Sequence, residues 1–443
     1  MTSCRRPVAD LREVDEVLER LQRAGSGLRA RPLGEIVTAL GRVGARFLDK
    51  DDPVRRRALT GLPDEARISP PMAQAVLDGM AADWSEARLR ALVSAEFEEP
   101  AVLDGWVARV GPGAEASRPR ATRRLRAFGP TLCVQIVSGS VPGVAVHALL
   151  RGLLVKAPTL LKPGKGDALL AGLFAEALAE EDPGLADALA VVYWPGGSEE
   201  VERRVLQAAE VAVIYGGDET VEALRALAPA TTRVVAYHHR VGVGVVGRGA
   251  LGVGVGEATA AEVARAVALF EQRGCVCPQV VFVEEGGAVT PADFAREVAA
   301  ALDALEADLP SAPQEAEESA GVAQLRGTLE LQEAAGRSEV HHGGGEAPWT
   351  VAFEVEPLAL PTGGPRTVRV RPVPDLSEVQ SMLTPLGPHL QSVGYAGLGK
   401  ELEEVAGVLG RVGASRIVPF RALSFPPPWW LHDGRGPLTE LVR

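Results

Sequence analysis

The sequence predicts an α/β protein built on parallel β-sheets, and three features lead to this prediction. Short apolar runs alternate with helical segments between about residues 130 and 240. Several runs end in glycine or proline, as buried strands do where they lead into loops. Near residue 240 a second unit begins, with VGVGVV, a helical pattern and CVCPQVVFVEEG. Strands that alternate with helices form parallel sheets with helices on both faces.

The composition describes a large, acidic chain with an apolar core. It has 443 residues, of which 46% are hydrophobic, and a net charge of −12. At roughly 100–200 residues per domain, two or three domains are expected. The acidic balance argues against a general nucleic-acid binder, which needs a basic face.

The same sequence gives expectations for the compartment. No apolar run approaches the roughly 20 residues of a membrane span, and the N-terminus lacks the apolar core of a signal peptide. The cysteines are too few for a disulfide framework in a chain of this length; they are Cys4, Cys133, Cys275 and Cys277. We therefore expect a cytoplasmic protein with no membrane span.

The N-terminal region, residues 1–118, is predicted to be mostly helical. Apolar residues recur there at helical spacing among charges, most clearly over 33–48, 70–81 and 85–95. The segment Gly111–Arg124 is rich in Gly, Pro, Ala and Arg, so we expect a connector there.

The segment that follows alternates strands and helices in a regular order. Strands are expected at 131–139, 159–162, 188–194, 211–217 and 233–239. Helices are expected between them at 144–154, 167–180, 199–208 and 219–227. A nucleotide then belongs at the carboxyl ends of the strands.

The second unit continues the α/β pattern with a long interruption. A helix is expected from about 259 to 272, strands at 349–355 and 366–371, and helices near 375–385 and 399–411. Residues 311–346 are rich in Gln, Glu, Gly and Ser and are expected to be loop-like. The tail SFPPPWWLHDGRGPL is rich in proline, so an irregular path is expected.

Six motifs carry a resemblance to a known family. They are SGSVPG (138–143), GLLVKAPTLLKPGKGD (152–167), IYGGDET (214–220), FEQRGCVCPQ (270–279), LQSVGYAG (390–397) and LHDGRGPLTELVR (431–443). In these motifs the chain resembles the aldehyde dehydrogenase superfamily, and more closely the bioluminescence-type (Lux) fatty acyl-CoA reductases. The resemblance implies an aldehyde dehydrogenase-like fold, with a Rossmann-type cofactor domain and an α/β catalytic domain.

Cys275 is the candidate nucleophile. A lone cysteine is more often a small buried hydrophobe than a reactive group. Within FEQRGCVCPQ, however, the resemblance assigns Cys275 to the position of the family nucleophile. A thiolate suits this role because it exchanges readily with the thiolate of a thioester. Cys277 is interpreted as a packing residue.

Lys162, Lys165, Gly216 and Gly217 are the candidate cofactor residues. The resemblance implies that Lys162 binds the adenosine ribose, and that Lys165 stands where relatives that prefer NAD carry an acid. A cation there attracts a 2′-phosphate, which favours NADPH. Gly216 and Gly217 precede a predicted helix whose N-terminus suits a pyrophosphate.

Two departures from the superfamily concern the chemistry. The stretch AYHHRVGVG (236–244) has no acid where aldehyde-oxidising relatives carry the glutamate that activates water. Ser140 stands where relatives have the asparagine of the oxyanion hole, leaving the Cys275 backbone N–H as the other donor. His238 or His239 could serve the thiol, although capping or packing is an equal alternative. His341 and His342 lack further ligands at fixed spacing, so no metal site is expected.

These features together predict an acyl-CoA reductase that makes a fatty aldehyde through an acyl-cysteine. Residues 1–240, helical over 1–118, are expected to bind NADPH, 241–418 to carry the thiol, and 419–443 to form a C-terminal return segment. Two alternatives stay open: a CoA-acylating aldehyde dehydrogenase that runs oxidatively, and a non-catalytic acyl-transfer scaffold. The thioester, fatty acyl-CoA or a carrier-protein conjugate, also stays open, as do the chain length, an acyl-transferring protein partner and a homo-oligomer.

Overall fold

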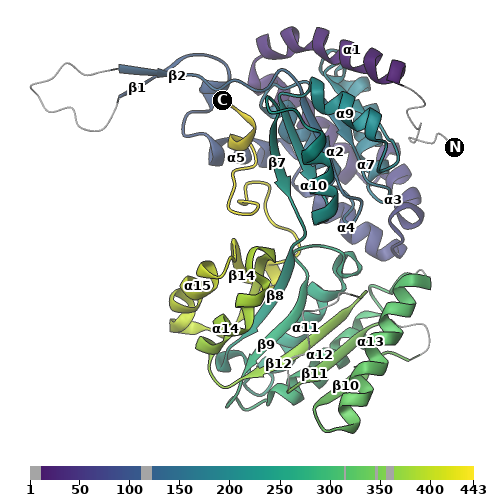
Figure 1. Cartoon of the computed structure of the whole chain (residues 1–443), viewed down its shortest axis with the longest axis vertical. Coiled ribbons are helices and arrows are strands. Elements are labelled where there is room, and N and C mark those ends of the chain that lie inside the picture. Colours follow the sequence, from purple (N-terminus) through teal and green to yellow (C-terminus); the bar gives the residue numbers. More distant parts are fainter. Residues whose placement is uncertain (1–10, 111–121, 314–315, 345–347, 356–363) are drawn as a thin grey trace, which may run out of the picture. The chain divides into compact units, whose positions relative to one another are not determined.

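The computed structural model describes residues 11–110, 122–313, 316–344, 348–355 and 364–443 (Figure 1). Its chain forms two compact units. The first contains Met1–Ala66, Leu77–His238 and Pro427–Arg443, and the second contains Arg67–Val76 and His239–Pro426. Cys4 and most of the expected connector at Gly111–Arg124 lie outside the described residues.

The sheet of the first unit is parallel and has the strand order β5-β4-β3-β6-β7. Its strands are β3 (Cys133–Ile136), β4 (Thr159–Lys162), β5 (Leu189–Val191), β6 (Val211–Tyr215) and β7 (Arg233–Tyr237). Every residue of β3 and β6 is buried, which explains the continuous apolar runs in the sequence. The chain leaves β3 toward β4 and later returns to its other side with β6, so the topological switch point lies between β3 and β6.

Helices cover both faces of this sheet, as the sequence predicts. The helices between the strands are α6 (Val144–Leu154), α7 (Ala168–Glu181), α8 (Pro183–Ala186), α9 (Glu199–Ala208) and α10 (Asp218–Leu227). On one face, Val14, Leu18 and Leu21 of α1 (Leu11–Ala30) pack with α9 over the strands. On the other face, aromatic rings of Phe47, Trp84 and Phe174 join α2 (Leu33–Leu48) to α7.

The N-terminal region is helical, with one strand pair that the sequence did not predict. Its further helices are α3 (Pro53–Ala66), α4 (Pro70–Ala82), α5 (Glu86–Glu96) and the 3₁₀ turn η1 (Pro100–Leu103). β1 (Val107–Val110) then pairs with β2 (Thr122–Leu125) in antiparallel register. The connector prediction is therefore wrong for the residues of β2. The reason is that TRRL has no apolar run or apolar alternation to signal a strand.

The sheet of the second unit has the order β10-β11-β12-β9-β8-β13-β14. Its strands are β8 (Val241–Val246), β9 (Pro278–Glu284), β10 (Ser338–His342), β11 (Thr350–Glu354), β12 (Thr367–Val373), β13 (Leu390–Ala396) and β14 (Arg416–Pro419). All neighbours pair in parallel except β10, which is antiparallel to β11.

Each face of this second sheet has its own core. α11 (Val255–Ala268) and α12 (Pro291–Leu305) pack together on one face, against Val281 and Val283 of β9. α14 (Val379–Leu383) and α15 (Leu402–Arg411) supply apolar residues to the other face. The remaining 3₁₀ turns are η2 (Arg248–Ala250), η3 (Leu269–Gln272), η4 (Leu376–Glu378), η5 (Thr384–His389), η6 (Gly399–Glu401), η7 (Phe420–Ala422) and η8 (Thr439–Leu441).

One prediction for the second unit is wrong. Residues 311–346 are not loop-like, because α13 (Ala316–Ala334) and β10 lie within them. α13 consists largely of Ala, Glu, Gln and Leu, which are good helix formers. It buries only Val322 and Leu329 among its described side chains, so it has little apolar periodicity to reveal it. The irregular tail is confirmed. Among the described residues, no helix combines the length and apolar character needed to cross a membrane.

Candidate active site

Cys275 lies on a short turn between α11 and β9 of the second unit. The backbone N–H of Cys277 donates to the carbonyl of Gly274 at 2.9 Å and closes this turn around Cys275. Of the three cysteines that the structure describes, Cys275 is half-buried whereas Cys133 and Cys277 are buried. Cys275 is therefore less buried than the other two described cysteines, as a nucleophile would have to be.

The backbone just before this turn has an unusual conformation. Phe270, Glu271 and Gln272 have φ values of 57°, 50° and 59°, all in the left-handed region. None is glycine, and each such residue costs about 1–2 kcal/mol relative to the right-handed form. Three in succession persist only where surrounding contacts hold them.

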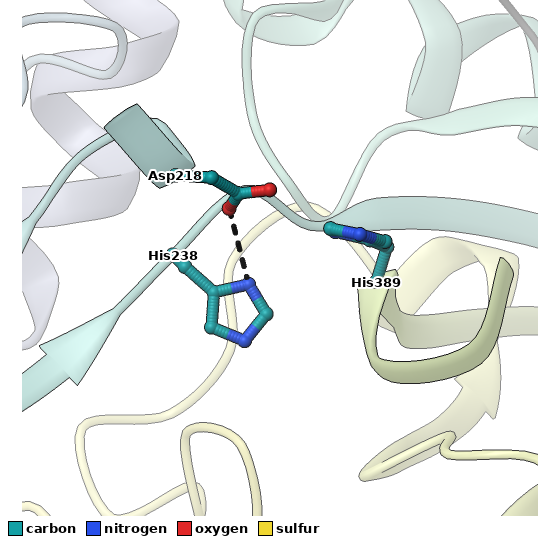
Figure 2. A group of neighbouring side chains, drawn as sticks. All are labelled: Asp218, His238 and His389. Carbon is teal, nitrogen blue, oxygen red and sulfur yellow. Dashed lines mark ion pairs between the residues drawn. The ribbon is translucent and has the colours of Figure 1, made fainter. Parts of the chain in front are cut away.

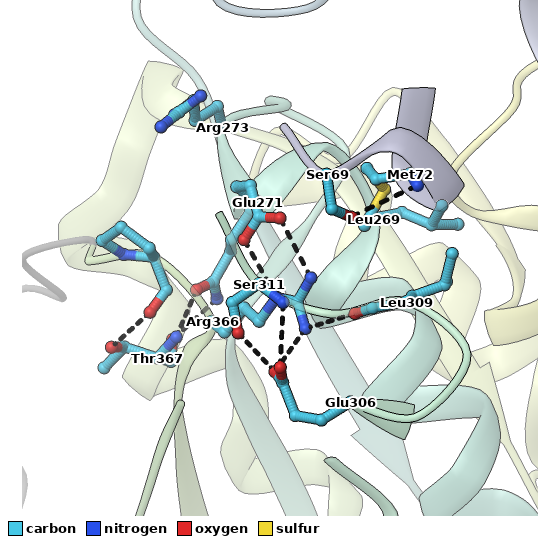
Figure 3. A network of polar contacts seen from close by, with 12 residues as sticks. Ser69, Met72, Leu269, Glu271, Arg273, Glu306, Leu309, Ser311, Arg366 and Thr367 are labelled. Atoms are coloured by element: carbon cyan, nitrogen blue, oxygen red, sulfur yellow. Dashed lines mark hydrogen bonds and ion pairs between the residues drawn. The ribbon is translucent and has the colours of Figure 1, made fainter. Parts of the chain in front are cut away.

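A buried ion pair supplies such contacts (Figure 3). Glu271 is 2% exposed and Arg366 is 0% exposed. The guanidinium of Arg366 binds both carboxylate oxygens of Glu271, with Nε–Oε2 and Nη2–Oε1 distances of 2.9 Å. Its Nη1 also donates to Glu306 at 2.5 Å and to the Leu309 carbonyl at 2.8 Å. Burial raises the pKa of Glu271 and the charge of Arg366 opposes this rise. We regard the carboxyl as ionised, because both its oxygens accept from a guanidinium.

The side chain of Gln272 holds the same segment from the other side. Its Nε2 donates to the carbonyls of Pro278 at 2.8 Å and Thr367 at 2.6 Å. Its Oε1 accepts from the backbone N–H of Thr367 at 2.5 Å. Pro278 and Thr367 are the first residues of β9 and β12, so Gln272 is joined to the amino ends of two neighbouring strands.

Cys277 differs from Cys275 in its surroundings. Its thiol is buried and donates to the carbonyl of Leu269 across 3.5 Å. Burial raises its pKa to about 12, so the thiol is protonated near neutral pH. A protonated, enclosed thiol is a poor nucleophile.

Arg416 provides positive charge near Cys275. This buried residue begins β14 and donates to the backbone carbonyls of Leu423, at 2.7 Å, and Ala422. Burial lowers the pKa of Arg416 to about 10, and an electrostatic interaction with Cys275 opposes this change. Because the interaction is reciprocal, a charged Arg416 favours the thiolate of Cys275.

The candidate cofactor residues lie at the carboxyl ends of strands in the first unit. Lys162 ends β4, is half-buried, and has its Nζ 5.7 Å from the centre of the Tyr193 ring. Burial lowers the pKa of Lys162, and the carboxylate of Glu202 opposes this shift. Gly217 is the residue before α10, and a Cβ atom placed on it would meet nothing within 4 Å.

The loop of Ser140 lies against the loop of Lys165. A Cβ on Gly164 would be 2.1 Å from the backbone nitrogen of Gly139, so only glycine allows this approach. Buried Asp167 then fixes the start of α6, since it accepts from the N–H groups of Gly143 and Ala145, each at 2.6 Å. Ser140 and Lys165 themselves are exposed. The open approach at Gly217, the helix N-terminus and Lys162 fit what the pyrophosphate and ribose of a dinucleotide need.

His238 and His239 each have a polar side chain as a neighbour. Nδ1 of His238 is 3.5 Å from a carboxylate oxygen of Asp218, at the start of α10 in the first unit (Figure 2). The carbonyl of His239, in the second unit, is 3.1 Å from Nδ1 of His389. His238 therefore has an acidic neighbour that sequence reasoning did not identify.

The structure thus groups Lys162, Lys165, Gly216, Gly217 and Ser140 in the first unit and places Cys275 in the second. Sequence reasoning missed Glu271, Arg366, Gln272 and Arg416. Glu271 and Gln272 stand within the quoted motif FEQRGCVCPQ, and their place beside Cys275 was the available signal. Arg366 and Arg416 are far from it in sequence, so only the fold could reveal them.

Arg416 should control the pH dependence of Cys275 reactivity. Replacing Arg416 with Met removes a cation, so the thiolate should form at higher pH. We expect the pH profile of Cys275 alkylation by iodoacetamide to move upward by about half a unit to one unit. Peptide mapping by mass spectrometry would follow the alkylation.

Two further variants complete this test. Arg416→Lys keeps the charge, so its alkylation profile should lie close to that of the wild type. Arg421→Met removes an arginine that is 74% exposed and should leave the profile unchanged. An Arg416→Met profile equal to that of the wild type would contradict the electrostatic role.

Comparison with solved structures shows the fold. The chain is similar to an NAD-dependent benzaldehyde dehydrogenase from Corynebacterium glutamicum, with 14% identity and a TM-score of 0.71 over 98% of this chain and 89% of that one. It is also similar to aldehyde dehydrogenase 21 from Physcomitrella patens, with 14% identity and a TM-score of 0.75 over 98% and 90%. An NADP-dependent glyceraldehyde-3-phosphate dehydrogenase from Bacillus halodurans C-125 has 15% identity and a TM-score of 0.72 over 98% and 90%.

Comparison with protein families shows the relationship more closely. A search of curated proteins found no significant match. The sequence model of the acyl-CoA reductase (LuxC) family, by contrast, matches residues 28–443. The expected aldehyde dehydrogenase-like α/β fold and the expected family are both confirmed. The chain is a member of the acyl-CoA reductase (LuxC) family, whose activity is the reduction of acyl-CoA.

Proposed function

We propose that the chain uses NADPH to reduce fatty acyl thioesters through an acyl-enzyme formed on Cys275. The observation that carries this proposal is the contrast between the cysteines. Cys275 stands accessible on its turn with Arg416 in electrostatic range, while Cys277 is buried and protonated. Only the first environment suits nucleophilic attack.

In this mechanism the Cys275 thiolate attacks the thioester carbonyl, and the thiolate of CoA or of a carrier protein leaves. The oxyanion is stabilised by the backbone N–H of Cys275, with Ser140 proposed as the second donor on the strength of the family resemblance. Arg416 keeps the nucleophile ionised before attack.

The candidate cofactor residues have distinct roles in this proposal. Lys162 binds the adenosine ribose, and Gly216 and Gly217 allow the pyrophosphate to approach the N-terminus of α10. Lys165 attracts the 2′-phosphate, which distinguishes NADPH from NADH. When bound, NADPH would supply a hydride for reduction of the acyl-cysteine. Cys275 would then leave as the thiolate when the aldehyde is released.

The fate of the acyl-enzyme depends on a missing base. Residues 236–244 contain no carboxylate to activate water. Deacylation therefore proceeds by reduction or by return to a thiol acceptor rather than by hydrolysis. His238, which has Asp218 beside it, is the alternative base.

The first test locates the acyl group. After incubation with labelled acyl-CoA in the absence of NADPH, we expect peptide mapping to find the label on Cys275. Cys275→Ala should remove it, and Cys277→Ser should leave it in place because Cys277 is enclosed. Label on Cys277 but not on Cys275 would refute the assignment.

The second test concerns cofactor choice. Lys165→Glu should lower kcat/KM for NADPH by about tenfold or more, the effect of losing one charge-assisted contact, while kcat/KM for NADH changes little. Lys50→Glu makes the same charge change at another exposed lysine and should alter neither value. Equal use of both cofactors by the wild type would exclude the preference for NADPH.

The third test concerns water. General-base catalysis is typically worth about 10²–10⁴-fold, so without a base the acyl-Cys275 adduct should persist when NADPH is withheld. Intact mass over time measures its decay in the wild type, His238→Ala and His239→Ala. If the wild type loses the acyl group to water as fast as it turns over, and one histidine variant does not, that histidine is a base and the enzyme also makes acids.

A further inference from the structure

We infer that the buried pair Glu271–Arg366 is a positioning device for Cys275, which holds the left-handed segment Phe270–Gln272 so that the thiol and its backbone N–H face the thioester carbonyl. This inference rests on the proposed role of Cys275 as the nucleophile. It assigns to Glu271 and Arg366 a task in the reaction, although neither touches the acyl group.

The first step is the anchoring of Arg366. Its guanidinium binds Glu271 through two nitrogens and uses the third for Glu306 and the Leu309 carbonyl (Figure 3). Glu306 and Leu309 follow the end of α12, which packs in the core of the second unit. Glu271 is therefore tied to the core through a planar group with fixed donor directions.

The second step is the short path to the nucleophile. Gln272 is fixed to the amino ends of β9 and β12, and Pro278 begins β9. Between Gln272 and Pro278 the chain makes one turn, closed by the bond from Cys277 to Gly274. With both ends fixed, the direction of Cys275 follows from the conformation at residues 270–272.

The residue type at position 271 is unfavourable for its backbone conformation. Glycine adopts the left-handed conformation without strain, whereas Glu271 does not. Burying a carboxylate and a guanidinium is also a costly way to gain stability, since apolar residues of similar size do as well or better. A bidentate pair does, however, fix the orientation of the residue that carries it. The pair thus suits a segment whose conformation, rather than its stability, matters for the reaction.

The experiment compares Glu271→Ala with Glu271→Gly in the full-length chain. Both lose the ion pair, but only glycine adopts the left-handed conformation freely. A misplaced reacting group can cost about 10²-fold in rate, so we expect a loss of that order in single-turnover acylation by acyl-CoA for Glu271→Ala. Glu271→Gly should acylate at least about fivefold faster than Glu271→Ala, the reverse of the usual effect of glycine.

Two readouts separate positioning from general damage. Alkylation of Cys275 by iodoacetamide needs no oxyanion donor, so it should fall much less than acylation, with no alkylation of Cys277. The acyl-CoA concentration for half-maximal rate and the affinity for NADPH should stay as in the wild type. Glu354→Gln breaks another buried pair of the second unit, Glu354–Arg371, and should lower stability without changing the acylation rate.

The outcomes are distinct. Acylation of Glu271→Ala at the wild-type rate, or no advantage of glycine over alanine, overturns the inference while the proposed function stands. A wild type that acyl-CoA does not acylate overturns the proposed function and this inference with it. If neither variant folds, Glu271→Gln, which keeps the shape and one acceptor, decides: acylation slower than wild type supports the inference, and the wild-type rate overturns it.

Discussion

One buried guanidinium, that of Arg366, binds the segment that leads into the turn of Cys275. Without Arg366, the strain of three left-handed residues would add to an uncompensated carboxylate at Glu271, and breaking such a pair typically costs about 3–5 kcal/mol. The same guanidinium connects η3, the segment that follows α12 and the start of β12. Arg366 therefore links the packing of the second unit to the segment that precedes Cys275.

The two units differ in the features that surround their candidate site residues. In the first unit, glycines shape the loops at the carboxyl ends of strands, where parallel sheets bind ligands. Gly139 and Gly164 let two loops lie in close contact, and Gly217 leaves open space before α10. In the second, buried side chains dominate near the amino ends of β9, β12 and β14, where Gln272 and Arg416 bond to backbone groups. A dinucleotide needs space and N–H groups, whereas a nucleophile needs charge and fixed orientation.

How much the sequence could predict followed from the strength of its local signals. Strands β3 and β6 of the first unit are buried along their whole length, so their apolar runs placed them within a few residues. α13 and β2 were not predicted. α13 buries few apolar side chains and β2 has no apolar run, so intrinsic propensity was the only local signal for either. Arg366 was unpredictable in principle, since a lone arginine in sequence is normally solvated and only tertiary contacts make it 0% exposed.

Cys275 and Cys277 show the same limit at the scale of one motif. They share a residue type and lie two positions apart, yet the turn between Gly274 and Cys277 directs one thiol inward to the Leu269 carbonyl and leaves the other accessible. Burial holds the pKa of Cys277 at about 12, while the charge of Arg416 acts on Cys275 from β14. Residue type alone cannot distinguish two such thiols, because their reactivity is set by desolvation and by a cation that is distant in sequence. The difference between the two thiols is thus set by the fold around them and not by the motif itself.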